Sequence, residues 1–307
     1  MSYHDAHFSR SSNGRTAPWS AFKVRLIIGL VIVLISIVSF YGSGQRNPVT
    51  GKHQRVAGLS PEDEIAIGLH AAPEMIAQHR GESRDLAGQR ALDRVGVRLL
   101  NALYHLVQDR GGGIPYEFDF HLLADPQTVN AFALPGGQVF ITEALYDRLQ
   151  NEAQLSGVLG HEVGHVIERH GAQQIAKGHL LQGIVGAAGV AGGSQSSAQL
   201  AQMIATVTQL KYGRQAELES DRWAVLLMAQ AGYNPEEMIT VMDILEDASG
   251  GGAPPEILST HPKPANRREY IREILEEQFP GGVSADLGRG APLHTDGGGY
   301  YQTERPN

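Results

Sequence analysis

Residues 152–177 read EAQLSGVLGHEVGHVIERHGAQQIAK, the most clearly helical stretch of this chain. We expect one helix over all of it, because its apolar residues recur at helical spacing. His161 and His165 are four residues apart, so both imidazoles lie on one face of that helix and can bind one metal ion. Glu162 follows the first of them and can take a proton from a water bound to that ion. The stretch therefore indicates a metal-dependent hydrolytic centre.

A third ligand is expected from an acidic stretch that begins 49 residues after the second histidine, at positions 214–221 (RQAELESD). Glu217 and Asp221 are four residues apart on one helical face of it. Glu217 can complete a His₂Glu site with a fourth position open for water. Asp221 can accept the free ring N–H of a ligand histidine. Such a stretch alone is more often a solvated charged face, but together with HEVGH it favours a metal site.

The third-histidine extension of the metzincin peptidases does not fit this sequence. It requires Gly at position 168 and His at position 171, where the chain has Glu168 and Gly171. His170 falls nine residues after His161, on the far side of a continuous helix. We therefore expect His170 to be structural or solvent-facing.

Composition limits any metal site to imidazole and carboxylate ligands. The 307 residues include 13 His and no Cys, which excludes disulfide scaffolds, thiolate metal sites and cysteine nucleophiles. Charge is unevenly distributed: residues 1–55 carry seven Lys or Arg against one Asp, and residues 56–307 carry 18 against 32 acids. The acidic body argues against a nucleic-acid partner, which needs a clustered basic face.

The basic leader, residues 1–25, precedes an apolar run that is long enough to cross a membrane. Residues 26–45 contain no charged side chain and begin LIIGLVIVLISIVSFY, so they can span a bilayer core of about 30 Å as a helix. Basic residues before the run place the N-terminus in the cytoplasm and the body outside it. A cleaved signal peptide, with Gly42 and Gly44 before the cut, is the alternative. We favour an uncleaved anchor, and both alternatives export the body.

The body is predicted to be a mostly helical α+β domain with a small sheet, covering residues 59–279. Ser60-Pro61-Glu62-Asp63 is a helix start, with a hydroxyl cap and a proline in the first turn. Helices are expected over residues 60–79, 86–107, 152–177, 198–231, from 234 onward and 264–279, and strands near 118–122 and 139–142. We expect a linker at 46–58, a short apolar connector at 180–193 and a disordered Gly-rich tail at 280–307.

Four stretches together resemble the gluzincin-type zinc metallopeptidases of family forty-eight, which include HtpX, BepA-like and mitochondrial Oma-type peptidases. The stretches are HEVGH at 161–165, Glu217-x-x-Ser220-Asp221 (similar to E-x-x-A-D), NAFALPGG at 130–137, and Thr260-His261-Pro262 followed by Arg267. Ser220 stands where the family usually has Ala. The resemblance covers about residues 59–279 and favours the exported or singly anchored branch.

The resemblance implies one zinc ion per chain, with Glu162 as general base. The family's T-H-P histidine implies His261 as the contact for the oxyanion, or alternatively as a group that blocks the zinc in a resting state. A plain loop histidine before a proline is the other interpretation. Tyr212 and Arg267 are weaker candidates for the oxyanion contact.

The segment that begins at Asn130 is expected to bind substrate. Gly136 and Gly137, followed by a strand at 139–142, would offer an exposed backbone edge to which an extended polypeptide adds as a strand. Val139 would then lie beside the substrate. A plain Gly-Gly turn is the alternative.

The expected function is zinc-dependent hydrolysis of unfolded or misassembled envelope and membrane proteins. The resemblance implies an anchor in a bacterial inner membrane, a periplasmic catalytic domain, and a second copy or envelope assembly factors as partners. The alternative is a non-proteolytic, zinc-stabilised chaperone or assembly factor, although such a scaffold has no need for Glu162. Aminopeptidase and prenyl-protein processing are disfavoured, because we find neither an amine-anchoring motif nor a multi-span chamber.

Overall fold

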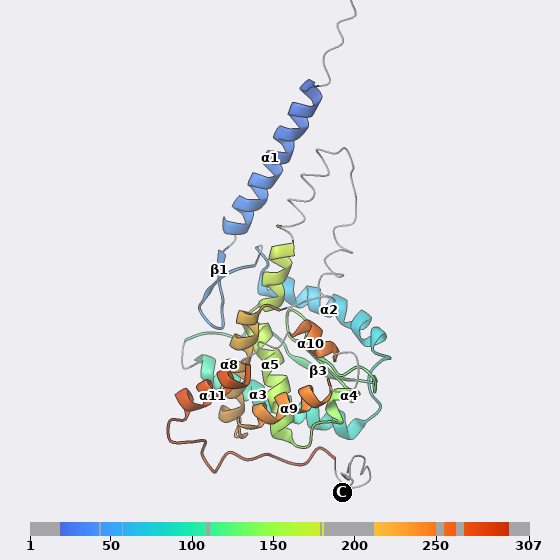
Figure 1. The fold of residues 1–307 in the computed structure, drawn as a ribbon, viewed down its shortest axis with the longest axis vertical. Coiled ribbons are helices and arrows are strands. Elements are labelled where there is room, and N and C mark those ends of the chain that lie inside the picture. Colours follow the sequence, from blue (N-terminus) through green and yellow to red (C-terminus); the bar gives the residue numbers. More distant parts are fainter. Residues whose placement is uncertain are drawn as a thin grey trace, which may run out of the picture.

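The computed structural model describes residues 19–42, 44–56, 58–108, 111–178, 180, 212–249, 255–261 and 267–294. Around the metal motif, helices surround a three-stranded sheet, and one long helix projects from this body (Figure 1). The predicted α+β class with a small sheet is confirmed.

Helix α1, Trp19–Gly42, stands clear of the body (Figure 1). Within the described residues it is the one helix long and apolar enough to cross a membrane, over Lys23–Gly42 with mean hydropathy 2.5. Its side chains remain exposed, as Leu34 at 60% and Val38 at 61% illustrate. A helix that is apolar on all sides and uncovered by protein is typical of a membrane span.

A β-hairpin follows α1 where the sequence predicts a linker at 46–58. Strands β1, Gly44–Arg46, and β2, His53–Arg55, pair antiparallel. Asn47 organises the turn, because its Oδ1 accepts from the backbone N–H groups of Val49 and Thr50. The linker prediction is therefore wrong for these residues. The sequence does not reveal the two strands, because they are short and polar and carry no hydrophobic alternation.

The main sheet has the order β3-β5-β4. Strand β5, Gln138–Thr142, is central, with β3, Asp119–Leu123, parallel on one side and β4, Ala131–Ala133, antiparallel on the other. All five residues of β5 are buried. The strands predicted near 118–122 and 139–142 are therefore present.

Helices α2, Pro61–Gln78, and α3, Leu86–Gln108, precede the sheet and match their predicted spans closely. Ser60 caps α2 as expected: its hydroxyl accepts from the Asp63 N–H, and the Asp63 carboxylate accepts from the Ser60 N–H. The remaining elements are α4, Glu143–Tyr146; α5, Glu152–Ile167; α8, Arg214–Gln230; α9, Glu237–Asp247; α10, Glu256–Thr260; and α11, Arg267–Gln278.

Helix α5 lies at the centre of the core, with every residue buried, and α8 packs along it. Two glycines of α5 permit this close approach. A Cβ on Gly164 would lie 2.9 Å from the Ser220 Cα, and one on Gly160 would lie 3.2 Å from the Ala224 Cα. Small residues at these crossing points bring the acidic face of α8 against the two histidines of α5.

The single helix predicted over 152–177 is interrupted. Helix α5 ends at Ile167, and Arg169 adopts a left-handed conformation with φ of 56° before helical backbone resumes at 170–178. The Arg169 side chain is buried, with its Nε 2.6 Å from Glu64 Oε1 and its Nη2 donating to the Leu59 carbonyl at 2.7 Å. These contacts hold the turn, and apolar periodicity alone does not reveal them.

Two further predictions differ from the structure or lie outside it. The predicted tail at 280–307 is ordered over 280–294: the Ala291 and Arg289 carbonyls accept from the Glu152 and Ala153 N–H groups at 3.0 and 2.9 Å. These bonds satisfy free N–H groups at the start of α5. The apolar connector at 180–193, beyond its first residue, and the helix predicted before position 212 lie outside the described residues.

Candidate metal centre

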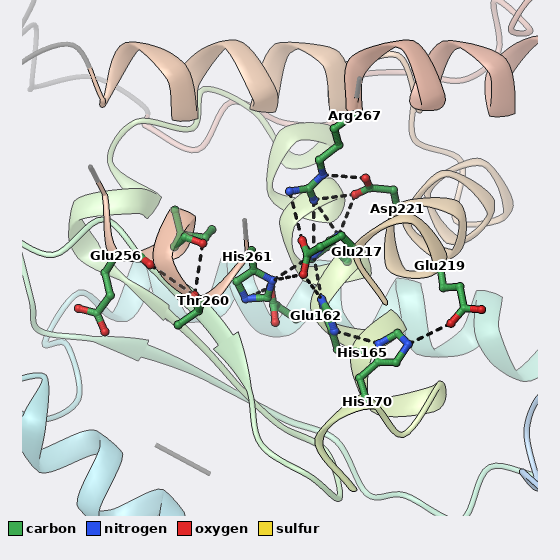
Figure 2. A network of polar contacts seen from close by, with 12 residues as sticks. Glu162, His165, His170, Glu217, Glu219, Asp221, Glu256, Thr260, His261 and Arg267 are labelled. Carbon is green, nitrogen blue, oxygen red and sulfur yellow. Dashed lines mark hydrogen bonds and ion pairs between the residues drawn. The ribbon is translucent and has the colours of Figure 1, made fainter. Parts of the chain in front are cut away.

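Four buried side chains meet at one point between α5, α8 and the end of α10. His161 and His165 come from α5, Glu217 from α8, and His261 follows α10. Figure 2 shows His165, Glu217 and His261 turned toward one another. One nitrogen or oxygen of each lies within 4.8 Å of the corresponding atom of every other. The Nε2 atoms of His161 and His165 are 3.0 Å apart, and each lies 3.5 Å from a Glu217 oxygen. This set can hold a metal ion.

His261 enters this cluster more closely than the sequence indicates. Its Nδ1 lies 3.2 Å from Glu217 Oε1 and 3.4 Å from His161 Nε2. Its Nε2 lies 3.8 Å from Glu162 Oε1, the predicted general base. The interpretation as a plain loop histidine is therefore wrong.

The two carboxylates of the centre are ionised. Burial acts to raise the pKa of Glu217, but His261 and His161 lower it well below its usual range. Burial likewise opposes ionisation of Asp221, but Arg267 and His161 lower its pKa. Glu217 is thus in the form that a metal ligand requires.

The environment of His161 shows that the centre stabilises one positive charge. Burial and Arg267 lower the pKa of His161, but hydrogen bonds to Asp221 and Glu217 outweigh them and raise it to about 9. Burial and the neighbouring His161 lower the pKa of His165 well below its usual value, which leaves that imidazole neutral. The field of the two carboxylates therefore favours a cation between these side chains.

Asp221 and Arg267 together hold His161 in place. Asp221 Oδ1 lies 2.9 Å from His161 Nδ1, which leaves the Nε2 atom facing the cluster. Arg267 donates to both oxygens of Asp221 at 2.7 Å, and its Nη1 lies 3.4 Å from Glu217 Oε2. The Arg267 guanidinium is thus committed to carboxylates, which disfavours it as an oxyanion contact.

His170 is buried and lies against the centre, so its predicted place on the far side of a continuous helix and the solvent-facing alternative are wrong, whereas the structural alternative is not contradicted. The turn at Arg169 brings it back against α5, where its Nδ1 lies 3.0 Å from His165 Nδ1. Its Nε2 lies 3.1 Å from Glu219 Oε2 of α8, and Figure 2 shows His165, His170 and Glu219 in a row. His170 and Glu219 are the residues near the centre that sequence reasoning missed.

Several buried polar atoms at the centre have no hydrogen-bond partner within the described residues: Glu162 Oε2, Glu217 Oε2 and His261 Nε2. Unpaired buried polar atoms are costly and usually indicate a bound ion or water. An imidazole and carboxylate donor set that includes two helical histidines four residues apart fits zinc chemistry. The observed residues therefore fit the metal that the motifs predict.

Comparison with models of known protein families identifies the family of this chain. A family model described as "Peptidase family M48" matches residues 96–275. The chain belongs to peptidase family M48. The matched residues include the HEVGH helix, the acidic stretch of α8 and His261.

The M48 relatives include bacterial and mitochondrial proteins. The chain is 31% identical over 209 residues to the Escherichia coli (strain K12) protein named "Beta-barrel assembly-enhancing protease", covering 64% of this chain and 43% of that protein. It is 34% identical over 163 residues to "Mitochondrial metalloendopeptidase OMA1" of Schizosaccharomyces pombe, covering 52% and 48%. It is 28% identical over 271 residues to "Metalloendopeptidase OMA1, mitochondrial" of Bos taurus, covering 83% and 50%. The chain spans half or less of each of these curated relatives.

The M48 centre lies between two pockets. One of about 350 Å³ reaches Glu162 and is lined mainly by apolar side chains of α9 and α10, including Met238, Val241, Met242 and Leu245. The other, of about 490 Å³, lies between His261 and β4 and is lined by Asn130, Phe132 and Tyr212 among others. Tyr212 also stacks on His165, with ring centroids 4.0 Å apart. Its ring thus covers one face of the His165 imidazole.

The exposed edge predicted at Val139 is wrong, because β5 is paired on both sides. Gly136 and Gly137 are required by backbone conformation and by close packing. Both have positive φ. A Cβ on Gly136 would lie 2.3 Å from the Ile65 Cα, and one on Gly137 would lie 2.5 Å from the Glu117 carbonyl oxygen. Strand β4 forms the edge instead, with the pocket beside it. Asn130 precedes this strand and lines that pocket, and its buried Oδ1 has no partner within the described residues.

Proposed function

We propose that this protein is a membrane-anchored, zinc-dependent endopeptidase that cleaves unfolded polypeptides. One observation carries the proposal: buried ligand atoms from His161, His165 and Glu217 converge in a cluster with His261, whose Nε2 lies 3.8 Å from Glu162 Oε1. Membership of family M48 and the relatives named as proteases support it. The match spans only part of those relatives, so their own substrates are not transferred to this chain.

In the proposed mechanism His161, His165 and Glu217 hold one zinc ion. When bound, this ion polarises the scissile carbonyl and makes a water acidic near neutral pH. Glu162 accepts the proton of the attacking water and then donates it to the leaving amine. Asp221 fixes the His161 tautomer, and Arg267 holds Asp221 ionised.

His261 closes the fourth side of the cluster in this structure. Because its Nδ1 lies 3.2 Å from Glu217 Oε1, a substrate carbonyl needs His261 to withdraw from the ligands. Its Nε2, free of partners within the described residues, is then available to donate to the oxyanion. We propose that His261 both restrains the resting centre and assists the reaction.

The surroundings of the centre favour an extended, partly apolar substrate. Among the strands that the structure describes, β4 is paired on one side only, and we propose that such a chain adds to its other side as a further strand. The apolar pocket beside Glu162 accepts a large apolar side chain next to the scissile bond. Unfolded and misassembled proteins present both features, which supports a role in envelope protein quality control, as does a relative named for β-barrel assembly.

The test is cleavage of unfolded casein by the full-length protein in detergent micelles. We expect cleavage to stop when a chelator removes the metal and to return when zinc is added. Product peptides, identified by mass spectrometry, should carry large apolar residues beside the cleaved bond. Cleavage that survives chelation would contradict the proposed metal centre. Products without an apolar preference beside the cleaved bond would contradict the proposed role of the apolar pocket.

For topology we propose that residues 1–25 are cytoplasmic, that residues 26–45 cross the bacterial inner membrane, and that the peptidase body is periplasmic. The basic residues before the apolar run, Arg10, Arg15, Lys23 and Arg25, support this orientation. A phosphatase reporter that is active only outside the cytoplasm should be active when fused after Gln45. An inactive phosphatase, together with an active cytoplasmic reporter at the same site, would reverse the orientation.

A further inference from the structure

We propose that His170 and Glu219 position the ligand His165, and that the hairpin of residues 44–56 completes this support. The inference rests on the proposed function, in which His165 binds the metal. It adds a chain of contacts that leads from the segment next to the membrane helix to the metal centre. Residues 44–56 lie outside the part of the chain that matches the family model.

The first step is a chain of hydrogen bonds that determines the His165 tautomer. The Glu219 carboxylate lies 3.1 Å from His170 Nε2 and can only accept there, so we infer that His170 Nε2 carries the proton of this contact in the neutral imidazole. His170 Nδ1 is then a bare acceptor, and the proton of the 3.0 Å contact belongs to His165 Nδ1. The lone pair of His165 Nε2 therefore faces His161 and Glu217, as metal binding requires.

The second step is the hairpin, which caps the C-terminal end of the helix that carries both histidines. Asn47 Nδ2 donates to the Ile167 carbonyl at 2.7 Å, and Gln54 Nε2 donates to the Glu168 carbonyl at 2.9 Å. Both amides are buried, so these contacts are made away from water. Carbonyls at the end of a helix have no partner within it, and here the hairpin provides one. The hairpin thus fixes the end of α5 where the chain turns toward His170.

The third step joins the hairpin to the hydrogen-bond chain itself. Lys52 Nζ lies 2.8 Å from Glu168 Oε1 and 3.3 Å from Glu219 Oε1, whose other oxygen contacts His170. The Lys52 side chain is 49% exposed, so its contribution is screened by water. We therefore rank the effects on His165 as largest for His170, smaller for Glu219 and smallest for Lys52.

The experiment measures zinc affinity of the metal-free, full-length protein in detergent, by competition with a chromophoric chelator. We expect His170→Ala to weaken zinc binding about 10- to 100-fold, the usual cost of losing such a supporting residue. His170→Asn should recover most of the affinity, because its Oδ1 can accept from His165 Nδ1–H. The zinc affinity of Glu219→Gln should lie between those of His170→Ala and His170→Asn. Lys52→Met should lower the zinc affinity about two- to fivefold. The matched control is His121→Gln, which removes an imidazole held by Glu82 and Gln138.

Nitrogen NMR of the imidazoles provides a second measurement that does not depend on the variants folding. In the metal-free wild type we expect His170 to carry its proton on Nε2 and His165 on Nδ1. The opposite tautomers, or equal zinc affinity of wild type and His170→Ala, would overturn the inference. Equal losses in His170→Asn and His170→Ala would also overturn it. If the wild type itself binds no zinc, the proposed function fails first.

Discussion

Replacing Glu162 by Gln is expected to reduce casein cleavage about 10²- to 10⁴-fold while zinc content stays at one ion per chain. Glu162 is buried and its Oε2 has no partner within the described residues, so the carboxylate is placed for proton transfer and not for packing. Glutamine keeps the size and shape of the side chain but cannot accept the proton. The measurement is the cleavage rate together with metal analysis of the same samples.

The control for this prediction is Glu277→Gln, which removes an exposed carboxylate that is paired with Arg222. It should cleave at the wild-type rate. If Glu162→Gln also cleaves at that rate, Glu162 is not the base. If neither variant nor wild type cleaves, yet all bind zinc and prevent aggregation of unfolded proteins, the non-proteolytic alternative is correct.

Replacing Arg267 by Met is expected to lower the free energy of unfolding of the metal-free protein by about 3–5 kcal/mol. Arg267 is 6% exposed and makes two 2.7 Å hydrogen bonds to Asp221, whose side chain is fully buried. Its removal takes away the largest of the interactions that lower the pKa of Asp221 and leaves only His161 to oppose the effect of burial, so that pKa rises. Chemical unfolding of wild type and variant in the same detergent measures the difference.

The neighbouring Arg268 supplies the control. It forms ion pairs with Asp243 and Glu246, but all three side chains are at least 36% exposed. Surface ion pairs contribute little, so Arg268→Met should cost less than about 1 kcal/mol. If both variants lose the same free energy of unfolding, the buried pair of Arg267 with Asp221 contributes no more to stability than an exposed ion pair of α11.

The core of the site was predictable from sequence because it depends on helical spacing. His161 and His165 at four residues, and Glu217 and Asp221 at four residues, face one direction on any regular helix. Two segments with these spacings can share an ion when their helices pack closely. The small residues Gly164 and Ser220 allow that packing. They are a sequence signal for it that an analysis of apolar periodicity alone overlooks.

What was missed depends on departures from regular structure. His170 reaches His165 only because Arg169 takes a left-handed conformation, stabilised by Glu64 from a distant helix. No local signal marks this turn, since arginine has no preference for that conformation. A glycine follows at position 171, two residues too late to indicate the break.

The substrate edge was misplaced for a related reason. Sequence shows that a strand follows Gly136 and Gly137, but it does not show the order of strands in the sheet. Here the later strand, β5, is central and the short β4 lies at the edge. A three-residue strand is too short to show alternation, so only the fold identifies the free edge.

The most direct test of the proposed zinc peptidase is a titration in which bound zinc and casein cleavage are measured in the same samples. Metal-free full-length protein would receive zinc in steps up to two equivalents. We predict that the rate rises in proportion to bound zinc and levels off at one ion per chain, because His161, His165 and Glu217 form one centre. Cleavage by the metal-free protein, or a fully loaded protein that leaves casein intact, would contradict the account.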